Sequence, residues 1–259
     1  MPNPTELFSM RGKTCVVTGG HRGLGRAIAK AFLLAEAKRV YVNGRSVEAC
    51  VDTAKELSEF GDCQALPGDV GSLEGLTKFA AALSEKEDKI DVLVNNAGTG
   101  WGGAIEDFPE KGWDKVMDLN VKSPFFLVQK MLPLLRAAGQ KEQTASVINI
   151  GSIAGILGNP ANAFSYATSK AAIHQLTRNL AHELADDHIR VNAIAPGRFH
   201  SKMTEFVPEK MYEAEVKAIP LHRWGSDPDI MGVALLLASQ AGAFITGQIF
   251  NVDGGTTLL

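Results

Sequence analysis

The stretch 14–25, TCVVTGGHRGLG, joins a short apolar run to a glycine-rich turn and the start of a helix. The run 14–18 predicts a buried strand, and the apolar spacing over 24–37 predicts a helix directly after the turn. Glycines in this position let backbone N–H groups and the positive end of the helix face a phosphate. The stretch therefore predicts a dinucleotide-phosphate site, although its spacing, G-x-x-x-G-x-G, also fits a tight turn without a ligand. The residues of this predicted site are Gly19, Gly20, His21, Arg22, Gly23, Leu24 and Gly25.

The alternation of apolar runs and helical stretches continues along the chain. Further strands are predicted at 39–43, 62–66, 91–94, 146–150, 190–194 and 248–252, and further helices at 47–60, 73–85, 111–138, 164–184 and 227–238. Strands that are apolar throughout are typical of a parallel sheet covered on both faces. We therefore predict an α/β protein with one Rossmann-type domain over 1–259, a doubly wound parallel seven-stranded sheet and helices on both faces. The helix 111–138 is expected to bend near Pro124 or to end at Pro133.

The composition excludes several classes of protein. The 259 residues are 45% hydrophobic and 21% charged, and 26 Lys and Arg against 29 Asp and Glu leave a net charge of −3. This balance argues against a nucleic-acid partner, and the short apolar runs argue against a membrane protein. Three cysteines without a C-x-x-C pair and an N-terminus without a secretory signal predict a cytoplasmic location. The spacing of His and Cys residues predicts no metal site.

The end of the second predicted strand bears on the choice of cofactor. An NAD site commonly places an acidic residue there, but this strand ends in Asn43, followed by Gly44 and Arg45. Arg45 and Arg22 can together bind a 2′-phosphate through charge-assisted bonds, which favours NADPH. Asp69, beside Val70 after the third strand, can accept from an adenine amino group, although it also fits an ordinary turn aspartate.

A second group of polar residues follows the later strands. Tyr166 and Lys170 lie four residues apart on a predicted helix, so they share a face. Ser152 follows the fifth strand, and the turn 95–98, NNAG, follows the fourth, so both reach the carboxyl edge of the sheet, where ligands bind. A phenol can supply the proton that a developing alkoxide needs, and a neighbouring ammonium would lower its pKa from about 10. Ser152 can donate to the substrate oxygen. The group predicts carbonyl reduction.

Together the turn 18–25, the NNAG turn, Ser152 and Tyr166-x-x-x-Lys170 resemble the short-chain dehydrogenases/reductases over nearly the whole chain. Shorter stretches, such as 149–152 and 195–199, resemble NADPH-dependent β-ketoacyl reductases within that family, which implies a 3-oxoacyl or related ketone substrate. The same resemblance implies a homo-oligomer, a tetramer or a dimer.

The resemblance also implies roles for individual residues. Tyr166 would be the general acid, Lys170 would bind the nicotinamide ribose, and Ser152 would orient the carbonyl. Asn120 would hold a water in a proton relay with Lys170. Cofactor contacts are implied for Asn96, Ala97 and Gly98, for Pro196 and Gly197, and on the carboxamide side for Phe199 and Ser201; the family more often has Thr at the last position.

The segment 199–220 interrupts the rhythm of strands and helices. Its Met and aromatic residues predict a substrate flap, although a static surface insertion fits as well. Trp101 is a candidate for the substrate pocket, and His174 is expected at a surface or an interface. Two other functions stay open at this point: an NAD-dependent alcohol dehydrogenase of the same family, and a nucleotide-binding scaffold without catalysis.

Overall fold

The computed structural model describes residues 3–158, 162–200 and 207–258. Within them, seven strands form one sheet in the order β3-β2-β1-β4-β5-β6-β7, and all neighbouring strands are parallel. The strands are β1 (Thr14–Val17), β2 (Arg39–Val42), β3 (Cys63–Ala65), β4 (Val92–Asn95), β5 (Ala145–Ile150), β6 (Ile189–Pro196) and β7 (Ile249–Val252). The predicted doubly wound sheet is confirmed. Its order reverses between β1 and β4, where such sheets bind ligands.

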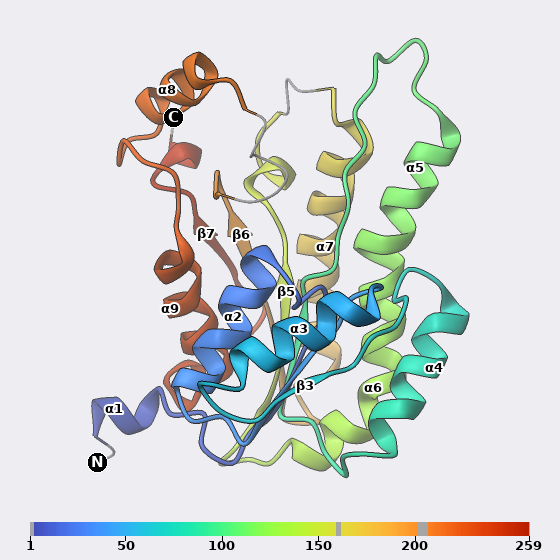
Figure 1. The fold of residues 1–259 in the computed structure, drawn as a ribbon, viewed down its shortest axis with the longest axis vertical. Helices are drawn as coiled ribbons and strands as arrows, with labels where there is room; N and C mark the ends of the chain where they lie inside the picture. The colour runs from blue at the N-terminus through green and yellow to red at the C-terminus, as the bar shows by residue number, and fades with distance from the viewer. Residues whose placement is uncertain (1–2, 159–161, 201–206, 259) are drawn as a thin grey trace.

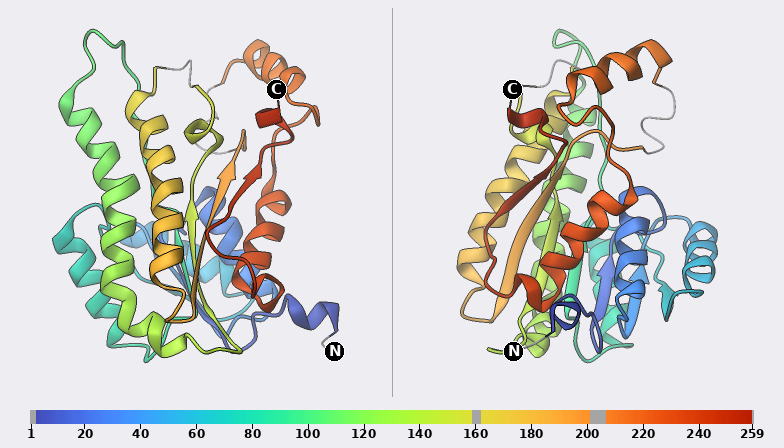
Figure 2. Two further views of the ribbon diagram at one scale, coloured as in Figure 1. Left: turned by 180° about the vertical axis from the view of Figure 1, so that it is seen from behind. Right: turned by 90° about the vertical axis from the view of Figure 1, so that its left-hand side faces the viewer.

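Helices cover both faces of the sheet (Figures 1 and 2). On one face lie α2 (Gly23–Leu34), α3 (Val47–Leu57) and α9 (Asp227–Ala238), and on the other lie α4 (Leu73–Ser84), α6 (Ser123–Ala138) and α7 (Phe164–Glu183). Each face has its own apolar core: Phe32 of α2 belongs to the first, and Phe79 of α4 and Met131 of α6 belong to the second. The inner strands are buried because both faces are covered.

The predicted helix over 111–138 is in fact two helices. α5 (Glu110–Met117) and α6 are joined by one π-helical turn, Asp118–Lys122, and α6 runs through Pro133 to its end. The expected end at Pro133 is therefore wrong. The irregular turn lies just before Pro124, where the other alternative placed a bend, and proline there has no N–H to donate to a regular α-helical turn. The π-turn carries Asn120, which is 3% exposed.

Two short elements complete the chain. α1 (Pro4–Leu7) is capped by Asn3 and was not predicted. α8 (Glu209–Ala218) lies within the predicted flap, beyond the carboxyl ends of the strands (Figure 1). Residues 201–206, which include Met203 and Phe206 of that flap, lie outside the described residues.

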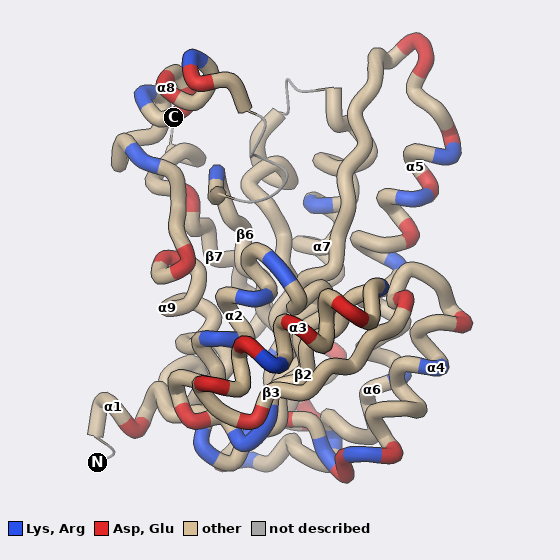
Figure 3. The backbone as a smooth tube through the Cα atoms, in the orientation of Figure 1, with Lys and Arg blue, Asp and Glu red and all other residues tan. Residues whose placement is uncertain are grey.

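Charge is spread over the surface in both signs. Lys and Arg are interspersed with Asp and Glu along α5 and α8 (Figure 3). In the described part of the chain, no helix is long and apolar enough to cross a membrane.

Candidate active site

The glycine-rich turn follows β1 and opens α2, as predicted. Gly19 and Gly23 have φ angles of 62° and 52°, a region that residues with a side chain disfavour. Arg22 is the N-cap of α2 but makes no side-chain capping bond. The first N–H groups of α2 are thus left without a capping side chain, and an anion is the ligand that such a helix end binds. These residues fit a dinucleotide phosphate.

Asn96 shapes this turn from the end of β4. Its Nδ2 donates to the carbonyl oxygens of Thr18 at 2.8 Å and Gly19 at 3.1 Å, and its backbone N donates to Thr18 Oγ1 at 3.0 Å. A Cβ added at Gly25 would lie 2.4 Å from Asn96 Nδ2, so this position requires glycine. The backbone N of Ala97 also donates to Thr18 Oγ1, at 3.1 Å. Direct cofactor contacts of Asn96, Ala97 and Gly98 remain predictions.

His21 links the turn to the end of β2. Its Nδ1 lies 3.2 Å from the carbonyl oxygen of Asn43, and a Cβ added at Gly44 would lie 2.3 Å from the same atom. This contact brings the neighbouring residues Arg22 and Arg45 to one corner of the site. Both arginines are exposed, and neither forms an ion pair within the part of the chain that the structure describes. Two unpaired guanidinium groups suit a 2′-phosphate.

The other residues predicted on the adenosine side bond to backbone. Asn43 is 1% exposed, and its Nδ2 donates to the carbonyl oxygens of Leu66 and Gly68, both at 3.0 Å, so it fixes the loop after β3. Asp69 Oδ1 accepts from the N–H of Gly71 at 3.0 Å, a contact typical of a turn aspartate. Val70 packs into the second apolar core. Contacts of Asn43, Asp69 and Val70 with an adenosine group remain predictions.

Ser152 and Tyr166 meet at the carboxyl edge of the sheet. Ser152 follows β5, and Tyr166 lies in the first turn of α7. Burial raises the pKa of the Tyr166 phenol above its ordinary value, and a hydrogen bond from Ser152 and the positive charge of Arg198 oppose that shift. The sequence predicted that Lys170 would lower this pKa; in the structure the opposing groups are Ser152 and Arg198.

Lys170 lies one helical turn after Tyr166 and is 6% exposed. Its Nζ donates to the carbonyl oxygen of Ile150 at 2.7 Å and lies 5.6 Å from the centroid of the Tyr166 ring. Burial lowers the pKa of the Lys170 ammonium to about 8, because the charged form loses hydration. An ammonium with a pKa near neutrality can both donate and recover a proton under ordinary conditions.

Asn120 uses its side chain within the protein. Its Nδ2 donates to the carbonyl oxygen of Thr99 at 2.9 Å and to Ser169 Oγ at 3.0 Å, and its Oδ1 accepts from the N–H of Thr99 at 2.9 Å. Ser169 Oγ donates in turn to the carbonyl oxygen of Tyr166 at 2.7 Å. Both amide hydrogens are therefore committed, so a relay water would need the remaining acceptor capacity of Oδ1 or the backbone carbonyl.

The end of β6 forms the remaining side of the site. Pro196 is its last residue, and the N–H of Gly197 donates to the carbonyl oxygen of Val252 at 2.9 Å. A Cβ added at Gly197 would lie 2.8 Å from the Cα of Asp253, so the two chain segments require a glycine there. Phe199 is buried. Ser201, the other residue predicted on the carboxamide side, lies outside the described residues.

Two residues without a role predicted from the sequence, His174 and Arg198, follow this group along the chain. His174, expected at a surface or an interface, is instead 5% exposed, and burial lowers the pKa of its imidazole to about 4. A Cβ added at Gly151 would lie 2.2 Å from His174 Nε2, so the ring packs beneath the residue that precedes Ser152. The spacing 166, 170, 174 on one helix face could have indicated this. Arg198 follows the Pro196-Gly197 pair, which was its only sequence signal.

Trp101 packs against α5. A Cβ added at Gly112 would lie 2.7 Å from its ring, and Lys115 Nζ lies 5.5 Å from the ring centroid. A role in the substrate pocket stays a prediction.

Comparison with known proteins identifies the family. Residues 19–257 match a family described as enoyl-(acyl carrier protein) reductase. The chain is 50% identical to the rhamnolipids biosynthesis 3-oxoacyl-[acyl-carrier-protein] reductase of Pseudomonas aeruginosa, over 96% of this chain and 97% of the relative. It is 34% identical to the 3-oxoacyl-[acyl-carrier-protein] reductase FabG of Thermotoga maritima, over 96% and 99%. The RhlG/NADP active-site complex of Pseudomonas aeruginosa superposes with a TM-score of 0.94 at 49% identity, covering 97% of this chain and 98% of that one.

The chain belongs to the short-chain dehydrogenase/reductase family, as the motifs predicted. It is an NADP-dependent oxidoreductase of that family.

Proposed function

We propose that the protein reduces a 3-oxoacyl thioester, or a closely related ketone, to a secondary alcohol with NADPH. The observation that carries this proposal is the meeting of Ser152, Tyr166 and Lys170 at the carboxyl edge of the sheet, beside the phosphate-binding turn. The names of the similar reductases from Pseudomonas aeruginosa and Thermotoga maritima support the choice of substrate.

In this proposal Ser152 and Tyr166 act on the same substrate oxygen. When bound, NADPH supplies the hydride that reduces the carbonyl carbon. The Ser152 hydroxyl donates to the carbonyl oxygen and orients it, and the Tyr166 hydroxyl gives its proton to the alkoxide that develops there. Burial favours the neutral phenol, so Tyr166 carries its proton at ordinary pH.

Lys170 and Asn120 then restore the proton. The phenolate that forms when the proton leaves is stabilised by the Ser152 hydrogen bond and the positive charge of Arg198, and Lys170 lies beside the ring. Lys170 can pass on a proton because the pKa of its ammonium is about 8. Asn120 fixes the backbone at Thr99 and, through Ser169, the first turn of α7. In the proposed mechanism Asn120 thereby holds the backbone next to Tyr166 in place for the transfer of the proton.

A panel of substrates tests the proposal. Loss of NADPH absorbance is followed with 3-oxoacyl thioesters, a simple diketone and an enoyl thioester, the last because the matched family description names enoyl reduction. We expect turnover with the 3-oxoacyl thioesters and none with the enoyl thioester. Reduction of the enoyl thioester alone would overturn the proposal, and binding of NADPH without turnover of any compound would favour the non-catalytic scaffold.

We also propose a cytoplasmic homo-oligomer, a tetramer or a dimer. Large apolar side chains are exposed at Phe244 and Leu258, near the last strand, and at Trp113 and Phe125 on α5 and α6. Three free buried cysteines in the described chain suit a reducing compartment. Light scattering on the purified protein tests the assembly; a monomer at micromolar concentration would contradict it.

A further inference from the structure

In the described part of the chain, helix α8 makes few ionic and ring contacts with the rest of the protein, and one of them is the ring of Tyr212 with His200, 6.1 Å between centroids. None of its residues is buried. Tyr212 packs edge-to-face on Trp224, with ring centroids 4.8 Å apart, and Glu215 pairs with Arg198. A helix without a buried apolar face gains little from the hydrophobic effect, so these few contacts decide where it lies.

The Arg198–Glu215 ion pair is the charged contact of α8. Arg198 Nη2 lies 2.8 Å from Glu215 Oε1, and the side chains are 47% and 17% exposed. The second carboxylate oxygen, Oε2, is buried and has no hydrogen-bond partner among the described residues. Arg198 is thus the ion-pair partner that compensates a largely desolvated carboxylate, which makes the pair more consequential than an ordinary surface pair.

The same arginine lies at the edge of the sheet where Ser152 and Tyr166 meet, because it follows β6, which pairs with the strand that leads to Ser152. It stands two residues beyond the end of β6, next to Gly197. Charged and titratable groups surround this part of the site. They are Lys170 and His174 from α7, Arg198 and His200 from the loop after β6, Tyr212 and Glu215 from α8, and Arg223, Asp229 and Asp253, which line the same cavity as Arg198. The charge of Arg198 acts on the Tyr166 phenol. The guanidinium group that binds α8 therefore lies at the same edge of the sheet as Tyr166.

We propose that Arg198 is a positioning residue of the reaction, and that its ion pair with Glu215 holds α8 at the edge of the sheet where Tyr166 lies. Glu215 has two effects here: it anchors α8, and it offsets part of the positive charge that faces Tyr166. The placement supports this, because α8 lies beyond the carboxyl ends of β6 and β7, the edge at which doubly wound sheets bind their substrates (Figure 1).

A neighbouring ion pair shows what a purely structural pair looks like. Arg223 binds Asp229 through two bonds, at 2.6 and 2.7 Å, and Asp229 also accepts from the N–H and hydroxyl of Ser226 at the start of α9. Asp229 therefore has both carboxylate oxygens engaged. Within the described residues Glu215 has no such second set of bonds, so Arg198 is the ion-pair partner that the structure shows for α8.

The first test needs no substrate, so it is independent of the proposed function. Glu215→Gln keeps the shape of the side chain and removes its charge. The matched control is Glu213→Gln, which makes the same change on the same helix at an exposed residue that forms no ion pair within the described chain. We expect amide hydrogen exchange over 209–218 to rise about three- to tenfold in Glu215→Gln and to stay unchanged in the control. Equal exchange in the two variants would overturn the anchoring role.

The second test uses the pH dependence of alcohol oxidation with NADP. Arg198→Met removes the positive charge and should move the apparent pKa of the reaction upward, whereas Glu215→Gln leaves that charge unopposed and should move it downward. A merely structural pair would give both variants the same defect. The exchanged pair Arg198→Glu with Glu215→Arg should recover low exchange in α8 but not the pH profile. Shifts of the same sign, or no shift in either variant, would overturn the positioning role.

Discussion

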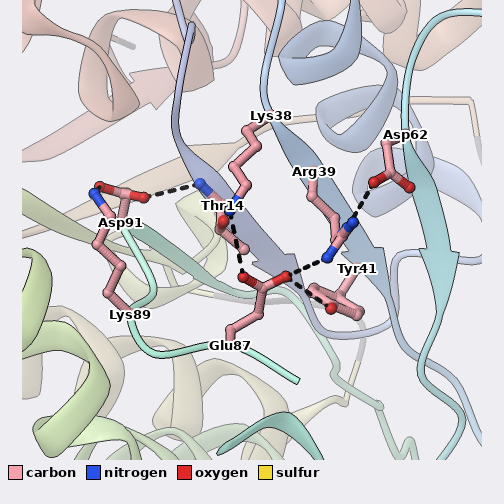
Figure 4. Close-up of polar contacts among 8 residues, drawn as sticks. All are labelled: Thr14, Lys38, Arg39, Tyr41, Asp62, Glu87, Lys89 and Asp91. Atoms are coloured by element: carbon pink, nitrogen blue, oxygen red, sulfur yellow. Dashed lines mark hydrogen bonds and ion pairs between the residues drawn. The ribbon is translucent and has the colours of Figure 1, made fainter. Parts of the chain in front are cut away.

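The amino ends and the carboxyl ends of the strands form two opposite edges of the central sheet, and charged groups are arranged differently at each. At the amino edge, Glu87 accepts from Arg39 Nη1 at 2.7 Å and from the Tyr41 hydroxyl at 2.9 Å, and Lys38 Nζ lies 3.8 Å away (Figure 4). Arg39 Nε donates in addition to Asp62 at 2.6 Å. These bonds tie the start of β2 to the residues before β3 and β4. A buried carboxylate with several partners is compensated for its lost hydration.

A second cluster at the same edge follows this pattern. Asp91, 1% exposed, accepts from the N–H of Thr14 at 2.8 Å and from Lys89 Nζ at 3.1 Å (Figure 4). It thus links the start of β1 to the start of β4.

At the carboxyl edge, several buried polar groups have no hydrogen-bond partner within the described residues. Of the five such side-chain atoms in the described chain, Ser165 Oγ, His174 Nε2, Glu215 Oε2 and Trp224 Nε1 lie on α7, α8 or the loop before α9, and the fifth, Ser239 Oγ, lies at the end of α9. Lys170 is buried with one hydrogen bond, to a carbonyl. Groups that are fully paired stabilise the fold, whereas groups with spare capacity cost stability and stay free to bind and react. The paired charges that stabilise the fold and the candidate catalytic residues therefore lie mainly at opposite ends of the same strands.

The largest effect is expected from a substitution that changes the carboxyl edge alone. Tyr166→Phe removes the proton donor and keeps the ring, so turnover should fall by about two or more orders of magnitude while NADPH still binds. Thermal unfolding should change little, because the phenylalanine keeps the packing of the ring and only the hydrogen bond with Ser152 is lost. Turnover assays, fluorescence titration with NADPH and a melting curve check the three parts. Near-normal turnover would show that another group supplies the proton.

The second prediction concerns a substitution that changes the amino edge alone. Glu87→Gln leaves Arg39 and Tyr41 without their shared acceptor charge, and the free energy of unfolding should fall by about 2–3 kcal/mol. Turnover per folded molecule should not change, because the cluster lies at the other end of the strands. The control is Glu85→Gln, at a nearby exposed residue. Urea unfolding of both variants measures the difference, and a loss of turnover that exceeds the loss of folded protein would contradict the separation of the two edges.

A third prediction concerns what Lys170 costs the fold. Its folded pKa of about 8 lies below the ordinary 10.5, so between these values the unfolded chain binds more protons and the wild type gains stability as pH rises. Lys170→Met should lack this gain. At pH 7 it should be more stable than the wild type by roughly 1–3 kcal/mol, an advantage that shrinks above pH 8. Unfolding at pH 7 and near pH 10 measures this, and a pH-independent difference would show that burial of the charge is not the cause.

The smallest expected effect concerns the corner formed by Arg22 and Arg45. Arg45→Ala should weaken NADPH about tenfold or more and NADH much less, because the lost bonds reach only the 2′-phosphate. Lys55→Ala, at an exposed lysine of the neighbouring helix α3, is the control for lost positive charge. Titration with both cofactors decides it. Equal weakening of NADPH and NADH would remove Arg45 from the 2′-phosphate site. Aspartate at position 44 is a poorer probe, since its Cβ would collide with His21.

The sequence predicted best those parts of the site that follow from the ends of strands and from spacing along a helix. Ser152, Tyr166 and Lys170 could be placed together because parallel strands end at one edge and four residues make one helical turn. Asn120 was placed through the family motif, but the π-turn that carries it was not foreseen, because Pro124 and Pro133 look alike in a helical pattern. His174 was misplaced, because its four-residue spacing after Tyr166 and Lys170, which puts it on the same helix face, was not taken into account.

By itself, the sequence determined the order of strands and helices, the glycine turn after β1 and the family, since periodicity, glycine placement and motif spacing are local properties. Only the tertiary structure decided how these parts act on one another. Asn96 bonds to Thr18 across 78 residues, Arg198 meets Glu215, and burial moves the pKa values of Tyr166 and Lys170 in opposite directions. Such effects arise from contacts between distant segments and from the loss of water around a group, and neither is written in a local stretch of sequence.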